Sequence, residues 1–345
     1  MSSPISSTTQ DSRRRLILHV GQPKTGTSAL QTWFVHNRSH LRDLGVNYPP
    51  HASDAAALKG KVVSGNGVGI HTVFVSDAVL ANQGAQRGDV NAFANQIDAS
   101  GHPTTVFSTE ALWKLDPDSL ARARTALDQR GIRLEVVAYV RDIAGHALSL
   151  YGQAVKRHKY IQDFSHFIGR VPTGFGFKQE VARSLFSWAE ILGNDALHVI
   201  HYDTHRKDTV APFIDVLGVP KDTIWVPGSI GEVNRSLTRE ELNLMRQLNQ
   251  KVANRGQLVK LSNILMDLPA LGSRKPRISR IDADFLLDVF ESDVDRINDA
   301  FFPEDQSLQV LGSVEVVDGP VDAAPLAPRA KFLLNWLAAA TPHLR

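Results

Sequence analysis

The chain has 345 residues, which is enough for one large α/β domain or two ordinary ones. Its 38 basic and 36 acidic residues leave a net charge of +2, a field too weak for a protein that coats nucleic acid. The absence of cysteine excludes disulfides, thiolate catalysis and cysteine-ligated metals.

The N-terminal stretch 1–14 is polar and lacks the apolar core of a signal peptide, so we expect a disordered arm. No run of about eighteen apolar residues occurs in the sequence, so no transmembrane segment is expected. These features favour a cytoplasmic protein that does not bind nucleic acid. They leave its oligomeric state open.

Apolar runs and helical patterns alternate from residue 15 onward. Residues 15–20 (RLILHV) form a short apolar run typical of a buried strand. Apolar residues then recur at helical spacing from Leu30 to Leu44, and Gly45 stands where a helix would end. The stretch 46–100, rich in glycine, alanine and asparagine, predicts long loops with short helices.

The same alternation continues toward the C-terminus. The predicted strands are 104–108, 134–140 and 196–202, and the predicted helices are 120–131, 141–157, 181–192, 238–254 and 282–301. This order predicts an α/β fold in which a central parallel sheet is flanked by helices. We expect one domain over 15–305, followed over 306–345 by a linker and a short C-terminal helix.

A glycine-bearing loop joins the first predicted strand to the first helix. In HVGQPKTGTS (19–28), Gly21 and Gly26 have the spacing of an ATP-binding P-loop, but residue 27 is threonine and the only lysine is Lys24. A strand-loop-helix of this kind points backbone N–H groups at an anion, and the helix dipole assists. The loop predicts a P-loop-like phosphate site, although a tight turn without a ligand has the same pattern.

A second segment, VVAYVRDIAGHALSLY (136–151), carries polar residues after a predicted strand. Arg141 stands at the carboxyl end of that strand, and Ser149 follows eight residues later. Ligands bind at this edge of open α/β sheets. Taken alone, Arg141 is also compatible with a surface ion pair to Asp142, and Ser149 with a solvated helix position.

Together, the two segments resemble the sulfotransferase family that uses 3′-phosphoadenosine 5′-phosphosulfate (PAPS). In that family a P-K-[ST]-G-T-[ST] loop holds the 5′-phosphosulfate, and an Arg with a Ser eight residues later holds the 3′-phosphate. The resemblance covers roughly residues 15–305 and implies the sulfotransferase fold, with PAPS as co-substrate. The nucleotide-binding residues that it implies are Pro23, Lys24, Thr25, Gly26, Thr27, Ser28, Arg141 and Ser149.

Two parts of the family pattern differ in this chain. The family often has Asn-Pro or Asp-Pro after its arginine, whereas this chain has Asp142-Ile143. Because such a proline presets the start of a helix, we expect its loss to change local rigidity more than ligand identity. The family's C-terminal R-K-G loop has no clear counterpart, and the basic stretch 273–280 is interpreted as a solvated loop.

The unusual position of the lysine has a chemical interpretation. Lys24 can donate to the bridging oxygen of the leaving 5′-phosphate, which stabilises the transition state electrostatically. A sulfuryl group carries less negative charge than a γ-phosphoryl group, so no metal is expected. The acceptor hydroxyl needs a general base. The resemblance aligns Glu110 with the histidine that acts as general base in the family. A glutamate at a helix start is also favoured by the helix dipole. His71 is the reserve candidate for the base.

These residues predict a sulfotransferase that moves a sulfuryl group from PAPS to an acceptor hydroxyl. Carbohydrates, glycolipids and small hydroxylated metabolites are all open as acceptors, with a family-level leaning toward carbohydrate. Two alternatives remain: a kinase with a deviant P-loop that uses ATP and Mg²⁺, and a non-catalytic nucleotide-binding protein of the same fold.

One histidine-rich group near the end of the last predicted strand has residue types that metals use. It contains His198, His201, Asp203 and His205. A strand sends residues 198 and 201 to opposite faces of the sheet. We therefore expect no metal site there.

Overall fold

The computed structural model describes residues 13–59, 63–170, 180–220, 236–271 and 275–319, together with isolated positions beyond residue 319. Nearly all of the predicted N-terminal arm and most of the predicted C-terminal helix lie outside the described residues. Within the described part of the chain, no helix is long and apolar enough to span a membrane.

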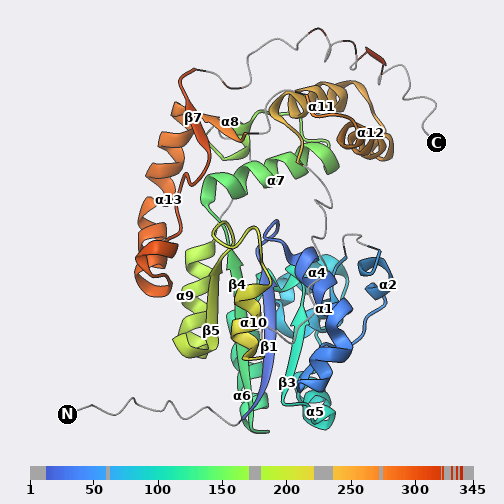
Figure 1. Cartoon of the computed structure of the whole chain (residues 1–345), viewed down its shortest axis with the longest axis vertical. Coiled ribbons are helices and arrows are strands. Elements are labelled where there is room, and N and C mark those ends of the chain that lie inside the picture. Colours follow the sequence, from blue (N-terminus) through green and yellow to red (C-terminus); the bar gives the residue numbers. More distant parts are fainter. Residues whose placement is uncertain are drawn as a thin grey trace.

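A five-stranded sheet forms the centre of the molecule (Figure 1), and its strand order is β2-β3-β1-β4-β5. All four neighbouring pairs are parallel. The α/β class with a parallel central sheet is therefore confirmed. The strands are β1 (Arg14–Gly21), β2 (Val46–Asn47), β3 (Thr104–Ser108), β4 (Ile132–Val140) and β5 (Leu197–His201).

Helices cover both faces of this sheet. One face packs against α1 and α10, where Ile17 of β1 lies in a core cluster with Trp33 and Phe213. The other face packs against α5, α6 and α9, where Leu16 and Leu18 lie in a second cluster. Adjacent residues of β1 enter different clusters because strand side chains alternate between faces. The helices are α1 (Thr27–Asp43), α5 (Val90–Ser100), α6 (Pro117–Asp128), α9 (Val181–Leu192) and α10 (Ala211–Leu217).

The stretch 46–100 contains short helices, as predicted. They are α2 (Asp54–Ala57), η1 (Asn66–Ile70), α3 (His71–Phe74) and α4 (Asp77–Gln83), and a further short turn, η2 (Glu110–Lys114), follows β3. Asn66 connects this stretch to the sheet, because its side chain donates to the Val106 carbonyl at 3.0 Å and accepts from the Ser108 N–H at 2.8 Å. This packs η1 against the carboxyl end of β3.

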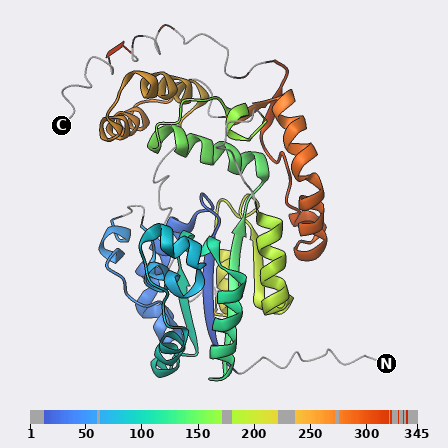
Figure 2. The same cartoon turned by 180° about the vertical axis from the view of Figure 1, so that it is seen from behind.

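A helical layer lies beyond the carboxyl ends of the strands (Figures 1 and 2). It contains α7 (Ile143–Arg157), α8 (Phe164–Phe167), α11 (Arg239–Lys251) and α12 (Arg255–Asp267), and α13 (Arg280–Phe301) runs from this layer down beside α9. Both α11 and α12 pack on α7. The periodicity predicted a single helix over 238–254; the structure has α11 and also α12, which begins at an N-cap where Asn254 accepts from the Gln257 N–H.

Residues that the sequence analysis assigned to a linker contribute to the core. Leu308, Val310 and Val314 are buried in the cluster that also contains the α7 side chains. The strand β7 (Glu315–Val317) pairs in parallel with β6 (Arg277–Ser279), after the turn η5 (Glu304–Gln306). The chain thus returns to the helical layer after α13.

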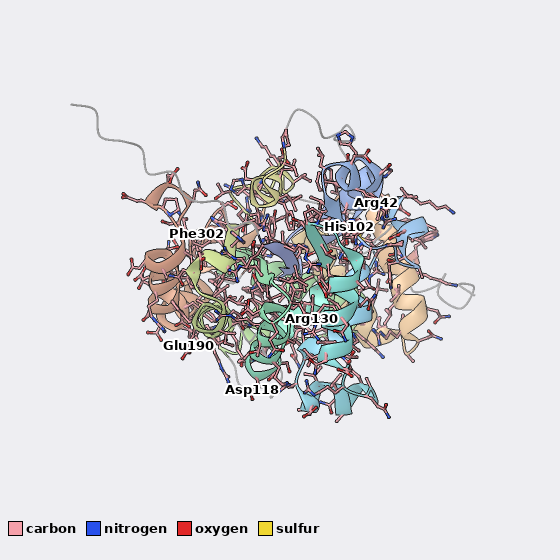
Figure 3. The ribbon with its side chains drawn as sticks, turned by 90° about the horizontal axis from the view of Figure 1, so that it is seen from below. Arg42, His102, Asp118, Arg130, Glu190 and Phe302 are labelled. Atoms are coloured by element: carbon pink, nitrogen blue, oxygen red, sulfur yellow. The ribbon has the colours of Figure 1, made fainter. Side chains whose placement is uncertain are left out.

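At the opposite end of the molecule, where the strands begin, a polar contact joins the segment after α6 to α5. Figure 3 shows this end from below, with Arg130 labelled near the C-terminus of α6. Arg130 Nη2 donates to Asn95 Oδ1 of α5 at 2.7 Å. The residues predicted to bind a ligand lie at the other end of the strands.

Candidate functional site

The two predicted phosphate-binding segments follow neighbouring strands. β1 pairs with β4 along its whole length, from Arg14 opposite Ile132 to Gly21 opposite Tyr139. After β1 the chain turns toward β2 at one edge of the sheet, and after β4 it turns toward β5 at the other edge. Open α/β sheets bind their ligands at such a switch point.

The loop between β1 and α1 has the strand-loop-helix form that the sequence predicts. Lys24 has φ 72°, and Gly26, the N-cap of α1, has φ 77°. Left-handed residues in a tight turn of this kind form anion-binding concavities from successive N–H groups. A lysine in this region costs about 1–2 kcal/mol, so the surrounding structure must hold it there.

Two side chains from the β4–α7 segment hold the carbonyl groups of the loop. Arg141 Nη1 donates to the Lys24 carbonyl at 3.3 Å. His146 Nε2 lies 2.9 Å from the Pro23 carbonyl, and because a carbonyl only accepts, this nitrogen carries a proton. Burial, together with the Arg141 charge, lowers the pKa of His146 to about 3, so its ring is neutral. These anchors account for the strained conformation of Lys24.

Gly26 is required at the helix start for a second reason besides its positive φ. A Cβ at this position would lie 3.1 Å from Tyr202 Cε2 and 3.2 Å from Thr209 Cγ2. The segment after β5 therefore packs directly on the loop. Tyr139 strengthens this contact, because its hydroxyl donates to the Thr209 carbonyl at 2.6 Å.

Arg141 pairs with Asp203 and not with its neighbour Asp142. Its Nε lies 3.3 Å from Asp203 Oδ1, an ion pair without the alignment of a hydrogen bond. The guanidinium also lies over the Tyr202 ring, 5.3 Å from the centroid. Since only 14% of the side chain is exposed, Arg141 is held between the loop and the segment after β5.

Ser149 lies on α7, about two turns beyond Arg141. Its side chain is half-buried. Among the described residues, no hydrogen bond joins it to Arg141 or to the loop. The structure therefore brings Arg141 into contact with the loop, whereas the role of Ser149 stays a prediction.

Lys24 and Glu110 are electrostatic neighbours. Burial lowers the pKa of Lys24, the Glu110 carboxylate raises it, and the charges of Arg157 and Arg141 lower it further. Glu110 opens η2 directly after β3. Glu110 is partly exposed, but the surrounding protein removes enough water from its carboxyl group to raise its pKa. The Lys24 ammonium and the Lys24 backbone N–H act in the opposite direction and lower this pKa.

His71, the reserve candidate for a base, is bound within its own segment. Its Nδ1 lies 2.6 Å from the Val68 carbonyl, and its Nε2 lies 3.1 Å from Gln83 Oε1. Both ring nitrogens thus have partners nearby in the chain, one in η1 and one at the end of α4. Of the two candidates, Glu110 is the one that interacts with the loop.

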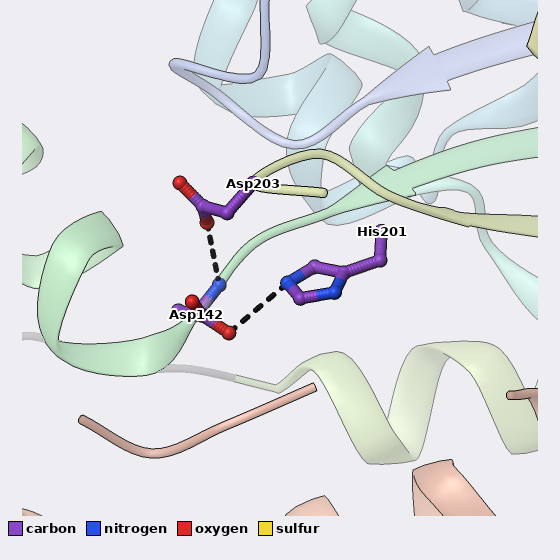
Figure 4. A group of neighbouring side chains, drawn as sticks. All are labelled: Asp142, His201 and Asp203. Carbon is purple, nitrogen blue, oxygen red and sulfur yellow. Dashed lines mark hydrogen bonds and ion pairs between the residues drawn. The ribbon is translucent and has the colours of Figure 1, made fainter. Parts of the chain in front are cut away.

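Three side chains next to Arg141 could hold a metal ion by residue type. Asp142, His201 and Asp203 offer ligand atoms within 4.8 Å of one another. They are already bonded to one another (Figure 4): His201 Nε2 lies 3.0 Å from Asp142 Oδ1, and the Asp142 N–H donates to Asp203 Oδ2 at 3.0 Å. His198 instead contacts Glu135, so residues 198 and 201 have separate partners. The three residues thus hold one another in place.

Several residues of this site were not singled out from the sequence, namely His146, Tyr202, Asp203 in its pairing with Arg141, and Thr209. Tyr202 and Asp203 did carry a signal, because they stand at the end of the predicted strand 196–202, and ligands bind at this edge of open α/β sheets. His146 carried only its position five residues after Arg141. Its partner is a backbone carbonyl distant in the sequence, and no local pattern encodes such a contact.

Comparisons with known proteins give weak similarity. No family model matches the chain, and no curated protein matches it. A solved sulfotransferase from Alicyclobacillus acidocaldarius is 17% identical with a TM-score of 0.38, over 72% of this chain and 96% of that one. A retinol dehydratase in complex with retinol and PAP is 13% identical with a TM-score of 0.30, over 83% and 80% of the two chains. At such scores the assignment depends on the residues of the site.

Proposed function

We propose that this chain is a PAPS-dependent sulfotransferase that transfers a sulfuryl group to an acceptor hydroxyl. The observation that best supports the proposal is the contact between Arg141 and the loop at Lys24. A nucleotide with phosphates on both its 5′ and 3′ oxygens needs two anion sites within the span of one nucleotide. The pairing of β1 with β4 supports this arrangement, because the two predicted sites follow these strands.

In this proposal the loop and the first turn of α1 bind the 5′-phosphosulfate. Pro23, Lys24, Thr25, Gly26, Thr27 and Ser28 form this part of the site. A helix N-terminus with a glycine-bearing turn suits an anion because its N–H groups and dipole face it. Thr27 Oγ1, in the first turn of α1, has no hydrogen-bond partner among the described residues.

The 3′-phosphate would bind Arg141, with Ser149 as a further donor. Arg141 can bind a phosphate through the edge of its guanidinium that faces away from Asp203, because the planar fork presents several donors at once. Since no described contact joins Ser149 to Arg141, we expect the serine to contribute less than the arginine. In this proposal Lys24 and Arg141 neutralise the negative charge of the nucleotide, and no metal ion takes part.

The proposed reaction is an in-line displacement at sulfur. The acceptor oxygen forms the new O–S bond while the S–O bond to the 5′-phosphate breaks, and that electron pair leaves on the phosphate. Glu110 accepts the proton of the acceptor hydroxyl; its raised pKa brings its basicity closer to neutral pH. Lys24 donates to the bridging oxygen as charge develops there.

The acceptor is a hydroxyl-bearing molecule, and we propose a carbohydrate or glycolipid as the first class to screen. The carboxyl edge of the sheet and the helices α7, α11 and α12 would surround it. A leaning toward sugars is an analogy with the family, so the nucleotide should be established before the acceptor.

Calorimetric titration of the purified full chain tests the nucleotide. We expect 3′-phosphoadenosine 5′-phosphate (PAP) to bind without Mg²⁺ and more tightly than adenosine 5′-phosphate (AMP). Replacing Arg141 by alanine should weaken PAP by about tenfold or more, the value of a charged hydrogen bond. Preference for ATP with Mg²⁺ would instead support the kinase. PAP binding with no PAP released from PAPS in the presence of any acceptor would support a non-catalytic nucleotide-binding protein.

A further inference from the structure

The segment 306–312, about 165 residues after Arg141 in the sequence, covers the N-terminus of α7. The Ile143 N–H donates to the Gln309 carbonyl at 3.1 Å, and the Ala144 N–H donates to the Val310 carbonyl at 2.8 Å. These are among the first N–H groups of the helix, which lack partners within it. This helix start is therefore occupied by protein backbone and is not an anion site.

The same segment binds the side chain of Asp142. The Gln309 N–H donates to Asp142 Oδ1 at 2.9 Å, and Gln306 contributes its carbonyl, 3.1 Å from His201 Nδ1. Gly312 approaches so closely that a Cβ there would lie 2.2 Å from Asp142 Oδ2. Asp142 and His201 are both buried, so their orientation depends on these contacts.

Asp203 connects the backbone of Asp142 to the Arg141 side chain. The Asp142 backbone N–H donates to Asp203 Oδ2, and Asp203 Oδ1 pairs with Arg141 Nε. Figure 4 shows His201 and Asp203 contacting Asp142 from two sides, the ring at its carboxylate and the carboxylate at its N–H. A continuous set of polar contacts thus joins Gln309 to the guanidinium.

We propose that the segment 306–312, acting through Asp142, His201 and Asp203, positions Arg141 for recognition of a 3′-phosphate. The inference rests on the proposed function of Arg141. It also accounts for the missing proline after Asp142, because proline has no N–H to donate to Gln309. His201 and Asp203 are positioning residues in this arrangement, since they act on the ligand through Arg141.

A pair of histidines on β5 provides a matched test. His201→Asn removes the contact to Asp142, while His198→Asn removes a comparable 3.0 Å contact to Glu135, a residue outside the site. The readout is the ratio of the PAP and AMP dissociation constants, measured by calorimetry on the full chain. We expect His201→Asn to lower the preference for PAP about fivefold, and His198→Asn to change it by less than about twofold.

Two glycines give a second pair, in case the histidine variants fold poorly. Gly312→Ala would push on Asp142. Gly101 also has a positive φ, 67° against 54° for Gly312, but its added carbon would have no atom within 4 Å. Only Gly312→Ala should reduce the PAP preference. Unchanged or equally reduced preference in both members of a pair would overturn this inference. A wild-type protein without any preference for PAP over AMP would overturn the proposed function itself.

Discussion

Arg141 Nη1 donates to the backbone carbonyl of Lys24 at 3.3 Å, which joins the two segments with predicted roles in anion binding. The contact has a mechanical consequence. Any ligand that moves the Arg141 guanidinium also acts on the loop that carries Lys24. We therefore expect occupancy of one anion position to influence the other.

Replacing Lys24 should separate stability from activity. Lys24→Gly removes both the ammonium and the strain of a side chain at φ 72°. Because a left-handed conformation costs a non-glycine residue about 1–2 kcal/mol, partly offset by the chain entropy of glycine, we expect the free energy of unfolding to rise by about 0.5 kcal/mol. Sulfuryl transfer should fall by about a hundredfold or more.

Lys24→Met is the matched control, because it removes the charge but keeps the strain. It should lose activity as Lys24→Gly does, without the gain in stability measured by urea denaturation. A Lys24→Met enzyme with wild-type turnover would contradict a role of the ammonium in the reaction.

Glu110 should determine how the rate of sulfuryl transfer falls at the acid side of its pH profile (the acid limb). Burial raises the pKa of Glu110, so its carboxylate begins to be protonated at a higher pH than an ordinary glutamate. A general base works only when deprotonated, and turnover should therefore fall as the pH decreases through this raised pKa. Glu110→Gln should lower kcat by about a hundredfold or more and abolish that limb. An acid limb that persists unchanged in Glu110→Gln would assign the base to another residue.

Much of the fold was readable from the sequence because its signals are local. The apolar run 15–20, the glycines of the loop and the helical spacing after it predicted β1, the loop and α1 in order. The predicted helix 238–254 corresponds to α11, whereas α12 (Arg255–Asp267) was not predicted from the sequence. Element boundaries depend on cap contacts that a periodicity pattern does not contain.

The site could be predicted only in part, because its contacts join segments that are distant in the sequence. Arg141 was predicted at the correct edge of the sheet, but its partner Asp203 follows β5, and the pairing depends on β4 and β5 being neighbours. The segment 306–312 was assigned to a linker from the sequence. Its burial follows from its position over α7, which composition cannot show.

His146 should affect both nucleotides equally. The His146 Nε2–H donates to the Pro23 carbonyl. It therefore holds the loop between β1 and α1, which both PAP and AMP would use. His146→Ala should weaken both ligands by about fivefold, the value of one buried hydrogen bond, and leave their ratio unchanged. His146→Gln can supply an N–H to the same carbonyl and should recover part of the affinity. A change of the ratio in His146→Ala would place this histidine with the 3′-phosphate instead of the loop.

Ile143→Pro tests why this chain lacks the proline of the related pattern. Ile143 is the first residue of α7, where the fixed φ of proline is compatible with a helix. Asp142 has ψ 134°, outside the α region that a following proline disfavours. The substitution deletes the hydrogen bond to the Gln309 carbonyl and trims a buried side chain.

We therefore expect Ile143→Pro to fold, with a free energy of unfolding lower by about 1–3 kcal/mol. Its preference for PAP over AMP should also decrease, because the segment 306–312 would hold Asp142 less firmly. Ile143→Ala is the control: it trims the side chain further but keeps the N–H, so it should lose stability and retain the preference. If the two variants showed the same PAP preference, the Ile143 N–H would have no part in positioning Arg141.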